Sequence, residues 1–322
     1  MKKFFQILFS LIFVIVILFV MSRAISWQDA LAAIHALSWT SIFLIMGFVL
    51  VIGALKATRF FFILRYGKVD ISWKNTVRIF IASQIMSPIP AGEVGRAMLF
   101  KRELDIHLSQ TAGPVFLQAL MELWTATLWI LLSVFFVGFL IGWWIVGLIV
   151  LLVILSAPLL LAKQLAPLLD RLKRRGFTAA WIEKIQTTFE HFEQLLSAQG
   201  KSSALKFWIL IVGLGLLVHA VGGGLLWYIA HLVGAHLTLL QGIFAAAMAA
   251  LIQGIFTIIP GGLGVTEGGL VGVISSFGIP WQMTIAITLL YRIATLPLTM
   301  LVALCFLLPI YGKKILALTS KI

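Results

Sequence analysis

Ionisable side chains inside otherwise apolar stretches are the first residues of this sequence that could do chemistry. With one neighbouring tyrosine, they are Lys56, Arg59, Glu93, Arg96, Glu122, Glu267, Tyr291 and Arg292. A charge in such surroundings is costly and normally faces a partner or a water-filled cavity. Arg96 and Arg292 are the strongest candidates for binding an anionic group. The carboxylates would balance the local charge, or receive a proton or a cationic group.

Simpler roles stay open for several of these residues. Lys56 and Arg59 lie one helical turn apart near the end of an apolar run, where long basic side chains can extend to a membrane surface. In a second simple role, Glu122 and Arg292 would form structural ion pairs with Arg96 and Glu267, respectively.

Two breaks that contain proline and glycine carry three of the charged residues. They cover 87–97 and 257–269, and their helix-breaking residues are Pro88, Pro90, Gly92, Gly95, Pro260, Gly261, Gly262 and Gly264. Proline stops a helix, and glycine permits backbone angles closed to other residues. A helix that restarts after such a break presents the positive end of its dipole, which favours an anionic group.

No pattern of metal or cofactor binding accompanies these residues. The six histidines are scattered, and no two of them have metal-ligand spacing on one helix face. His219 lies inside an apolar run and is expected as a hydrogen-bonded core residue. Phosphate-binding loops, dinucleotide-binding glycine motifs and nucleophile elbows are absent from the sequence. We therefore predict no metal and no cofactor.

The composition predicts the class of protein that must position these residues. Of 322 residues, 61% are hydrophobic and only 11% are charged, which is less than half the charged share of a typical soluble domain. The long apolar runs are 4–21, 39–64, 109–139, 142–162, 206–233, 239–259 and 281–308. About 20 apolar residues span a bilayer as a helix, so the sequence predicts an all-α polytopic membrane protein.

The basic residues predict the orientation of these helices and not a nucleic-acid partner. The net charge is +13, and the Lys and Arg residues concentrate before residue 4, in 65–74, in 163–206 and after residue 312. The segments 22–38, 139–141, 234–238 and 278–280 together hold a single basic residue, Arg23. Because basic loops stay in the cytoplasm, we predict cytoplasmic N- and C-termini.

The predicted orientation of the helices indicates an inverted-topology repeat. The two breaks would dip into the membrane from opposite sides as re-entrant hairpins, between six full transmembrane helices. The first half of this inverted-topology repeat is 1–139, and the second is 140–162 with 205–312. The basic cytoplasmic loop 163–204 interrupts the second half and carries an amphipathic helix at 178–198. In the alternative, the breaks are only kinks and the chain has eight transmembrane helices.

The two breaks also carry a family resemblance. SPIPAGEVGRA, followed by a helix with Glu122 and then by IIPGGLGVTEGG and YRIATLP, resembles the lysylphosphatidylglycerol synthase transmembrane-region family, also called flippase-like domain proteins. The resemblance covers roughly residues 5–310. The family's motif positions correspond here to Pro90, Gly92, Glu93, Gly95, Arg96, Pro260, Gly261, Gly262, Gly264 and Glu267.

The resemblance implies a single flippase-like domain over 1–322 that handles lipid in the bacterial inner membrane. Larger members add a cytosolic domain that transfers an amino acid from aminoacyl-tRNA to phosphatidylglycerol. We expect no such domain here, because the largest loop is too short for it. The leading hypothesis is a translocase or binder of anionic phospholipid or of polyprenyl-phosphate-linked lipid that is not an enzyme. The alternatives are an intramembrane head-group transferase, and an accessory subunit for a separate glycosyltransferase or acyltransferase.

Overall fold

The computed structural model describes most of the predicted membrane domain. The described residues are 38–86, 92–104, 106, 108–137, 201–256 and 260–308. The predicted first helix 4–21, the run 142–162 and the loop helix 178–198 lie outside them, as do Pro88 and Pro90. Every regular element among the described residues is helical, which confirms the predicted all-α class.

Four helices are long and apolar enough to cross a membrane, and they match four predicted runs. The spans are Trp39–Tyr66 in α3, Gly113–Ser133 in α6, Leu205–Leu232 in α10 and Trp281–Leu308. The complete α6 covers Leu108–Val137 and the complete α10 covers Lys201–Leu232. The last span begins as α13, Trp281–Ile293, and continues through the π-helix Ala294–Leu298, labelled η4. The protein is therefore a multi-pass membrane protein.

Shorter helices flank the two breaks. Around the first break are α4 (Trp73–Ser83), the 3-10 turn η1 (Gln84–Met86) and α5 (Gly92–Leu104). Around the second are α11 (Leu239–Ile255), the 3-10 turn η3 (Pro260–Gly262) and α12 (Val265–Ser275). With 17 and 11 residues, α11 and α12 are each shorter than the roughly 20 residues of a complete span.

Serine and threonine side chains cap the N-termini of several of these helices, where a backbone amide needs a hydrogen-bond acceptor. Ser38 accepts from the amide of Ser41 at 3.2 Å, and Ser72 accepts from that of Asn75 at 3.3 Å. At α11 the Thr238 hydroxyl accepts from the Gln241 amide while the Gln241 side chain accepts from the Thr238 amide. These caps satisfy amides that have no partner inside the helix.

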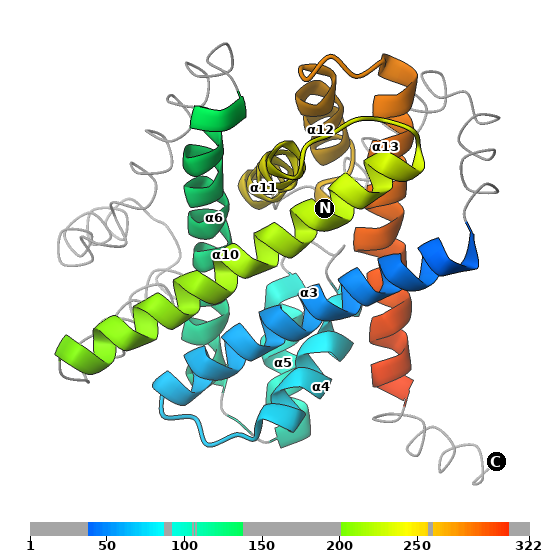
Figure 1. Ribbon diagram of the computed structural model, residues 1–322. Coiled ribbons are helices and arrows are strands. Elements are labelled where there is room, and N and C mark those ends of the chain that lie inside the picture. The colour runs from blue at the N-terminus through cyan, green and yellow to red at the C-terminus, as the bar shows by residue number, and fades with distance from the viewer. Residues whose placement is uncertain are drawn as a thin grey trace, which may run out of the picture.

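In Figure 1 the short helices lie between the long helices α6 and α13. In this view α3 and α10 run obliquely beside each other, while α6 and α13 stand on either side. The α11–α12 pair lies at one end of the bundle and the α4–α5 pair at the other. The loops that enter α11 and leave α12 lie at the same end. The helix pairs that flank the two breaks thus lie at opposite ends of the bundle.

Helices α10 and α11 cross closely because glycines line the contact. A Cβ on Gly223 would collide with the Ile243 backbone, and one on Gly242 would lie 2.6 Å from the Gly223 carbonyl oxygen. Small residues bring helix backbones together in membrane proteins, where packing is a main attraction between helices.

Gly223→Ala is therefore expected to lower the free energy of unfolding by about 1–3 kcal/mol, the usual cost of overpacking. The matched control is Gly213→Ala on the same helix, because a Cβ there meets nothing within 4 Å. Thermal unfolding of the detergent-solubilised protein compares the two variants. Equal melting temperatures for both would contradict the tight crossing.

Candidate functional site

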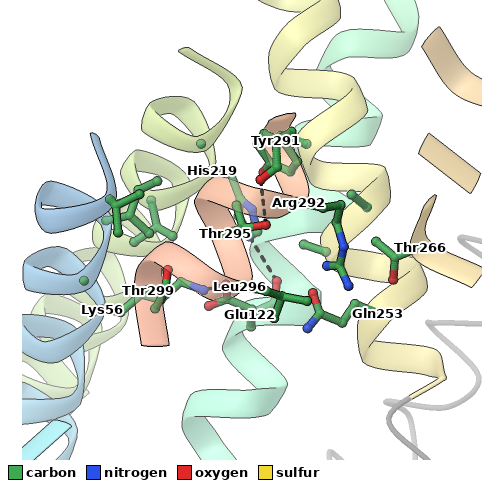
Figure 2. A pocket seen from close by; sticks show the side chains of 18 of the residues that line it. Lys56, Glu122, His219, Gln253, Thr266, Tyr291, Arg292, Thr295, Leu296 and Thr299 are labelled. Atoms are coloured by element: carbon green, nitrogen blue, oxygen red, sulfur yellow. Dashed lines mark hydrogen bonds and ion pairs between the residues drawn. The ribbon is translucent and has the colours of Figure 1, made fainter. Parts of the chain in front are cut away.

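A cavity of about 180 Å³ with charged, polar and apolar lining residues lies among the described helices. Helices α3, α6, α10, α11, α12 and α13 all contribute to its wall (Figure 2). Its polar lining residues are Lys56, Gln84, Glu122, His219, Gln253, Thr266, Tyr291, Arg292, Thr295 and Thr299. Three of the predicted site residues are not among these: Arg59 pairs with Glu122, Glu267 pairs with Arg292, and Arg96 is on α5.

The first charged cluster joins α3 to α6. The Lys56 ammonium lies 2.7 Å from one oxygen of the Glu122 carboxylate, and the Arg59 guanidinium pairs with the other oxygen. The Arg59 Nε also donates to the Gln118 side-chain oxygen at 3.1 Å. Lys56 and Glu122 are partly open to the cavity, with side chains 31% and 22% exposed, whereas Arg59 is fully buried.

Two predictions about this cluster are corrected. Arg59 does not extend to the membrane surface, because a carboxylate and an amide hold it inside the bundle. Glu122 pairs with Lys56 and Arg59 rather than with Arg96. Sequence spacing explains the arrangement: one helical turn separates the two cations on α3, and one turn separates Gln118 from Glu122 on α6.

The neighbouring helix α10 completes the cluster. The Nε2 of His219 lies 3.2 Å from the Glu122 backbone oxygen, which confirms the predicted hydrogen-bonded histidine. Gly215, one turn earlier, leaves room for Arg59, since a Cβ there would stand 2.7 Å from the Arg59 Nη1. That nitrogen is buried without a hydrogen-bond partner among the described residues.

The second charged cluster holds the second break together. The Arg292 Nε donates to one oxygen of Glu267 at 2.5 Å, and its Nη2 donates to the Gly261 carbonyl at 2.7 Å. The other oxygen of Glu267 accepts from the Gly264 amide at 2.5 Å. The ion pair of Arg292 with Glu267, one of the roles left open by the sequence, is therefore present. One side chain of α13 thus links the 3-10 turn η3 to the first turn of α12.

The glycines of this break are required by the backbone. Gly261, Gly262 and Gly264 have φ angles of 61°, 63° and 83°, a region that L side chains rarely adopt. We expected the restarted helix to offer its positive dipole end to an anion. Instead, the carboxylate of Glu267 occupies the Gly264 amide at the start of α12.

Comparison with known families decides the relationship suggested by the two breaks. The family model described as the lysylphosphatidylglycerol synthase TM region matches residues 7–303. The chain belongs to this family. No curated protein matches it. Membership indicates a membrane protein related to lipid handling, and the match covers both breaks and both charged clusters.

In this member of the lysylphosphatidylglycerol synthase TM-region family, Arg96 is not among the residues that line the cavity. Its Nε donates to the Ser83 hydroxyl at 3.1 Å, and its guanidinium lies 4.3 Å from the centre of the Phe80 ring. Gly95 packs where a Cβ would overlap the Met86 sulfur. These contacts tie α5 to α4 across the first break. The side chain of Glu93 lies outside the described structure.

We did not predict several residues that line the cavity of this protein, although the spacing of two of them along the sequence indicated a shared helix face. Thr295 and Thr299 follow Tyr291 at four-residue intervals and so lie on its helix face. The Thr295 hydroxyl donates to the Tyr291 carbonyl at 2.9 Å. The π-helix around Pro297 presents this face to the cavity, as such local widenings often do at functional sites.

Proposed function

We propose that this protein binds the phosphate-bearing head group of an anionic membrane lipid in the central cavity and moves that lipid between leaflets. The observation that carries the proposal is a charged cavity enclosed by otherwise apolar helices. Ionisable residues at such positions mark substrate pathways in membrane proteins. Lipid tails would stay in the surrounding bilayer.

The charge balance favours an anion over a cation. Both oxygens of Glu122 face cations, and both oxygens of Glu267 already accept hydrogen bonds. The Lys56 ammonium keeps donors beyond the one directed at Glu122, since an ammonium has three. Of the charged groups that line the cavity, those with unused hydrogen-bonding capacity are therefore positively charged donors.

The cavity volume limits the part of the lipid that enters. An engineered protein cavity of about 150 Å³ holds a benzene molecule. The cavity here, at about 180 Å³, is of similar size. A phosphate group with a small substituent fits such a volume, whereas a diacylated lipid does not.

The proposal also assigns a path across the bilayer. We place the α11–α12 pair as a re-entrant hairpin from the outer face and the α4–α5 pair as one from the cytoplasmic face, with both termini in the cytoplasm of a bacterium. Their positions at opposite ends of the bundle support this inverted arrangement. Broken helices that meet near the midplane are the substrate sites of inverted-repeat transporters.

Liposomes provide the direct test. Protein reconstituted into vesicles that carry fluorescent phosphatidylglycerol in one leaflet is expected to accelerate its exchange, which a membrane-impermeant quencher measures. A phosphatidylcholine probe in parallel vesicles reports selectivity. Acceleration of neither lipid would contradict translocation. A new lipid species in mass spectra of the vesicles would instead indicate a transferase.

Lys56→Met is expected to slow phosphatidylglycerol exchange about tenfold, the effect of losing one charge-assisted hydrogen bond. Glu122 keeps Arg59 as a partner, so the melting temperature should change little. Lys74→Met is the matched control, because it removes the same charge from an exposed position on α4. Equal rates for both variants would remove Lys56 from the proposed pathway.

A further inference from the structure

The hydroxyl of Thr266 is a buried polar group without an evident structural role. Its residue is 1% exposed, and its Oγ1 has no hydrogen-bond partner among the described residues. A buried polar atom without a partner costs about 1–3 kcal/mol. Thr266 nevertheless lines the cavity, in the first turn of α12 after the second break. Such a group is satisfied when a ligand enters.

Glycine at position 262 keeps the space around this hydroxyl open. A Cβ on Gly262 would lie 2.5 Å from the Thr266 Oγ1 and 3.2 Å from the Gln253 Cγ. Gln253, on α11, also lines the cavity, and its side chain makes no hydrogen bond in the described part of the chain. A hydroxyl and an amide with unused donors therefore flank the same small opening.

Arg292 supplies the charge beside these two groups. In the view of Figure 2 its guanidinium lies beside Thr266 and above Gln253, and all three residues line the cavity. A guanidinium carries five N–H groups. Glu267 and the Gly261 carbonyl take two of them, which leaves three for another acceptor. The two contacts hold the guanidinium in place, so it needs little reorganisation to bind.

We propose that Thr266, Gln253 and Arg292 form a phosphate subsite that holds the phosphodiester of the lipid head group at the second break. The inference rests on the proposed function and specifies where the phosphate binds. A hydroxyl, an amide and a guanidinium are all donors, and the nearby Glu267 carboxylate is turned to the Gly264 amide and to Arg292. Phosphate, with its several acceptor oxygens, matches this donor set.

The test compares binding of four probes to the full-length protein in detergent. Dihexanoyl phosphatidylglycerol carries the phosphodiester in a soluble lipid, and dihexanoylglycerol lacks the phosphate. Glycerol 3-phosphate and inorganic phosphate carry phosphate without acyl chains. We expect affinity for phosphatidylglycerol well above that for dihexanoylglycerol. Tight binding of the two acyl-free probes would assign the subsite to a free phosphate compound and overturn the lipid assignment.

Thr266→Val removes the hydroxyl and keeps the shape of the side chain. It is expected to weaken phosphatidylglycerol binding about tenfold or more, as loss of a hydrogen bond to a charged group does. Thr288→Val is the matched control, because the Thr288 hydroxyl is equally buried and without a partner in the described residues but does not line the cavity. Neither substitution removes a hydrogen bond seen in the structure, so both proteins should fold.

The outcomes separate this subsite from the proposed function. Wild-type affinity in Thr266→Val, or an equal loss in Thr288→Val, overturns the subsite, even if wild-type protein still moves lipid in vesicles. Phosphatidylglycerol binding that depends on Thr266, without any lipid exchange in vesicles, supports the subsite and overturns translocation.

Discussion

Glu122→Ala is expected to lower the free energy of unfolding by about 3–5 kcal/mol, the cost of breaking a buried ion pair from one side. The carboxylate faces two cations, one of which is the fully buried Arg59. Without it, the Gln118 amide oxygen is the one hydrogen-bond acceptor left for that guanidinium among the described residues. The melting temperature of the purified protein should fall steeply, and a lipid-exchange assay should show loss of function in parallel.

Two further variants test the cause of this effect. Lys56→Met should melt close to wild type, since it leaves the Arg59–Glu122 pair in place. Replacing Arg59 and Glu122 together by Met and Leu should recover most of the lost stability, because apolar residues often replace a buried pair without cost. A double variant as unstable as Glu122→Ala would show that packing, and not the unpaired charge, is responsible.

Arg292→Lys is expected to slow lipid exchange more than tenfold and to destabilise the second break. Lysine retains the charge but not the planar fork that bridges the Glu267 carboxylate and the Gly261 carbonyl. Loss of that bridge also removes the positioned donors beside Thr266. Exchange of phosphatidylglycerol in vesicles and the melting temperature in detergent measure the two effects separately.

Arg96→Lys is the matched control for this experiment. Arg96 is also a buried arginine next to a break, but it contacts Ser83 and Phe80 and does not line the cavity. Its variant should reduce stability while the exchange rate per folded protein stays near wild type. A larger loss of exchange in Arg96→Lys than in Arg292→Lys would move the site from the second break to the first.

The partners of the buried charges show how far sequence reasoning reaches. The pairing of Arg292 with Glu267 was one open role of these residues, and the structure shows it. The pairing of Glu122 with Arg96 was one open role, and the structure gives Glu122 two cations of α3 instead. Spacing along one helix shows which residues share a face. It does not show which face of another helix lies opposite.

The cavity lining illustrates the same limit. Thr295 and Thr299 share the face of Tyr291, so their spacing contained the information. Thr266 carried no comparable signal, because a threonine in the first turn of a helix is ordinary. Only its burial, its position in the cavity wall and its missing partner distinguish it.

The sequence by itself determined the membrane class, the four described spans, the position of both breaks and the family. These features follow from local properties: apolar length matched to the bilayer, and proline and glycine that interrupt helices. Tertiary structure alone decided that Arg59 is buried, that Arg96 lies apart from the cavity and that Thr266 lines it. Charges at the ends of long flexible side chains select partners by helix packing, which brings together residues more than 60 positions apart.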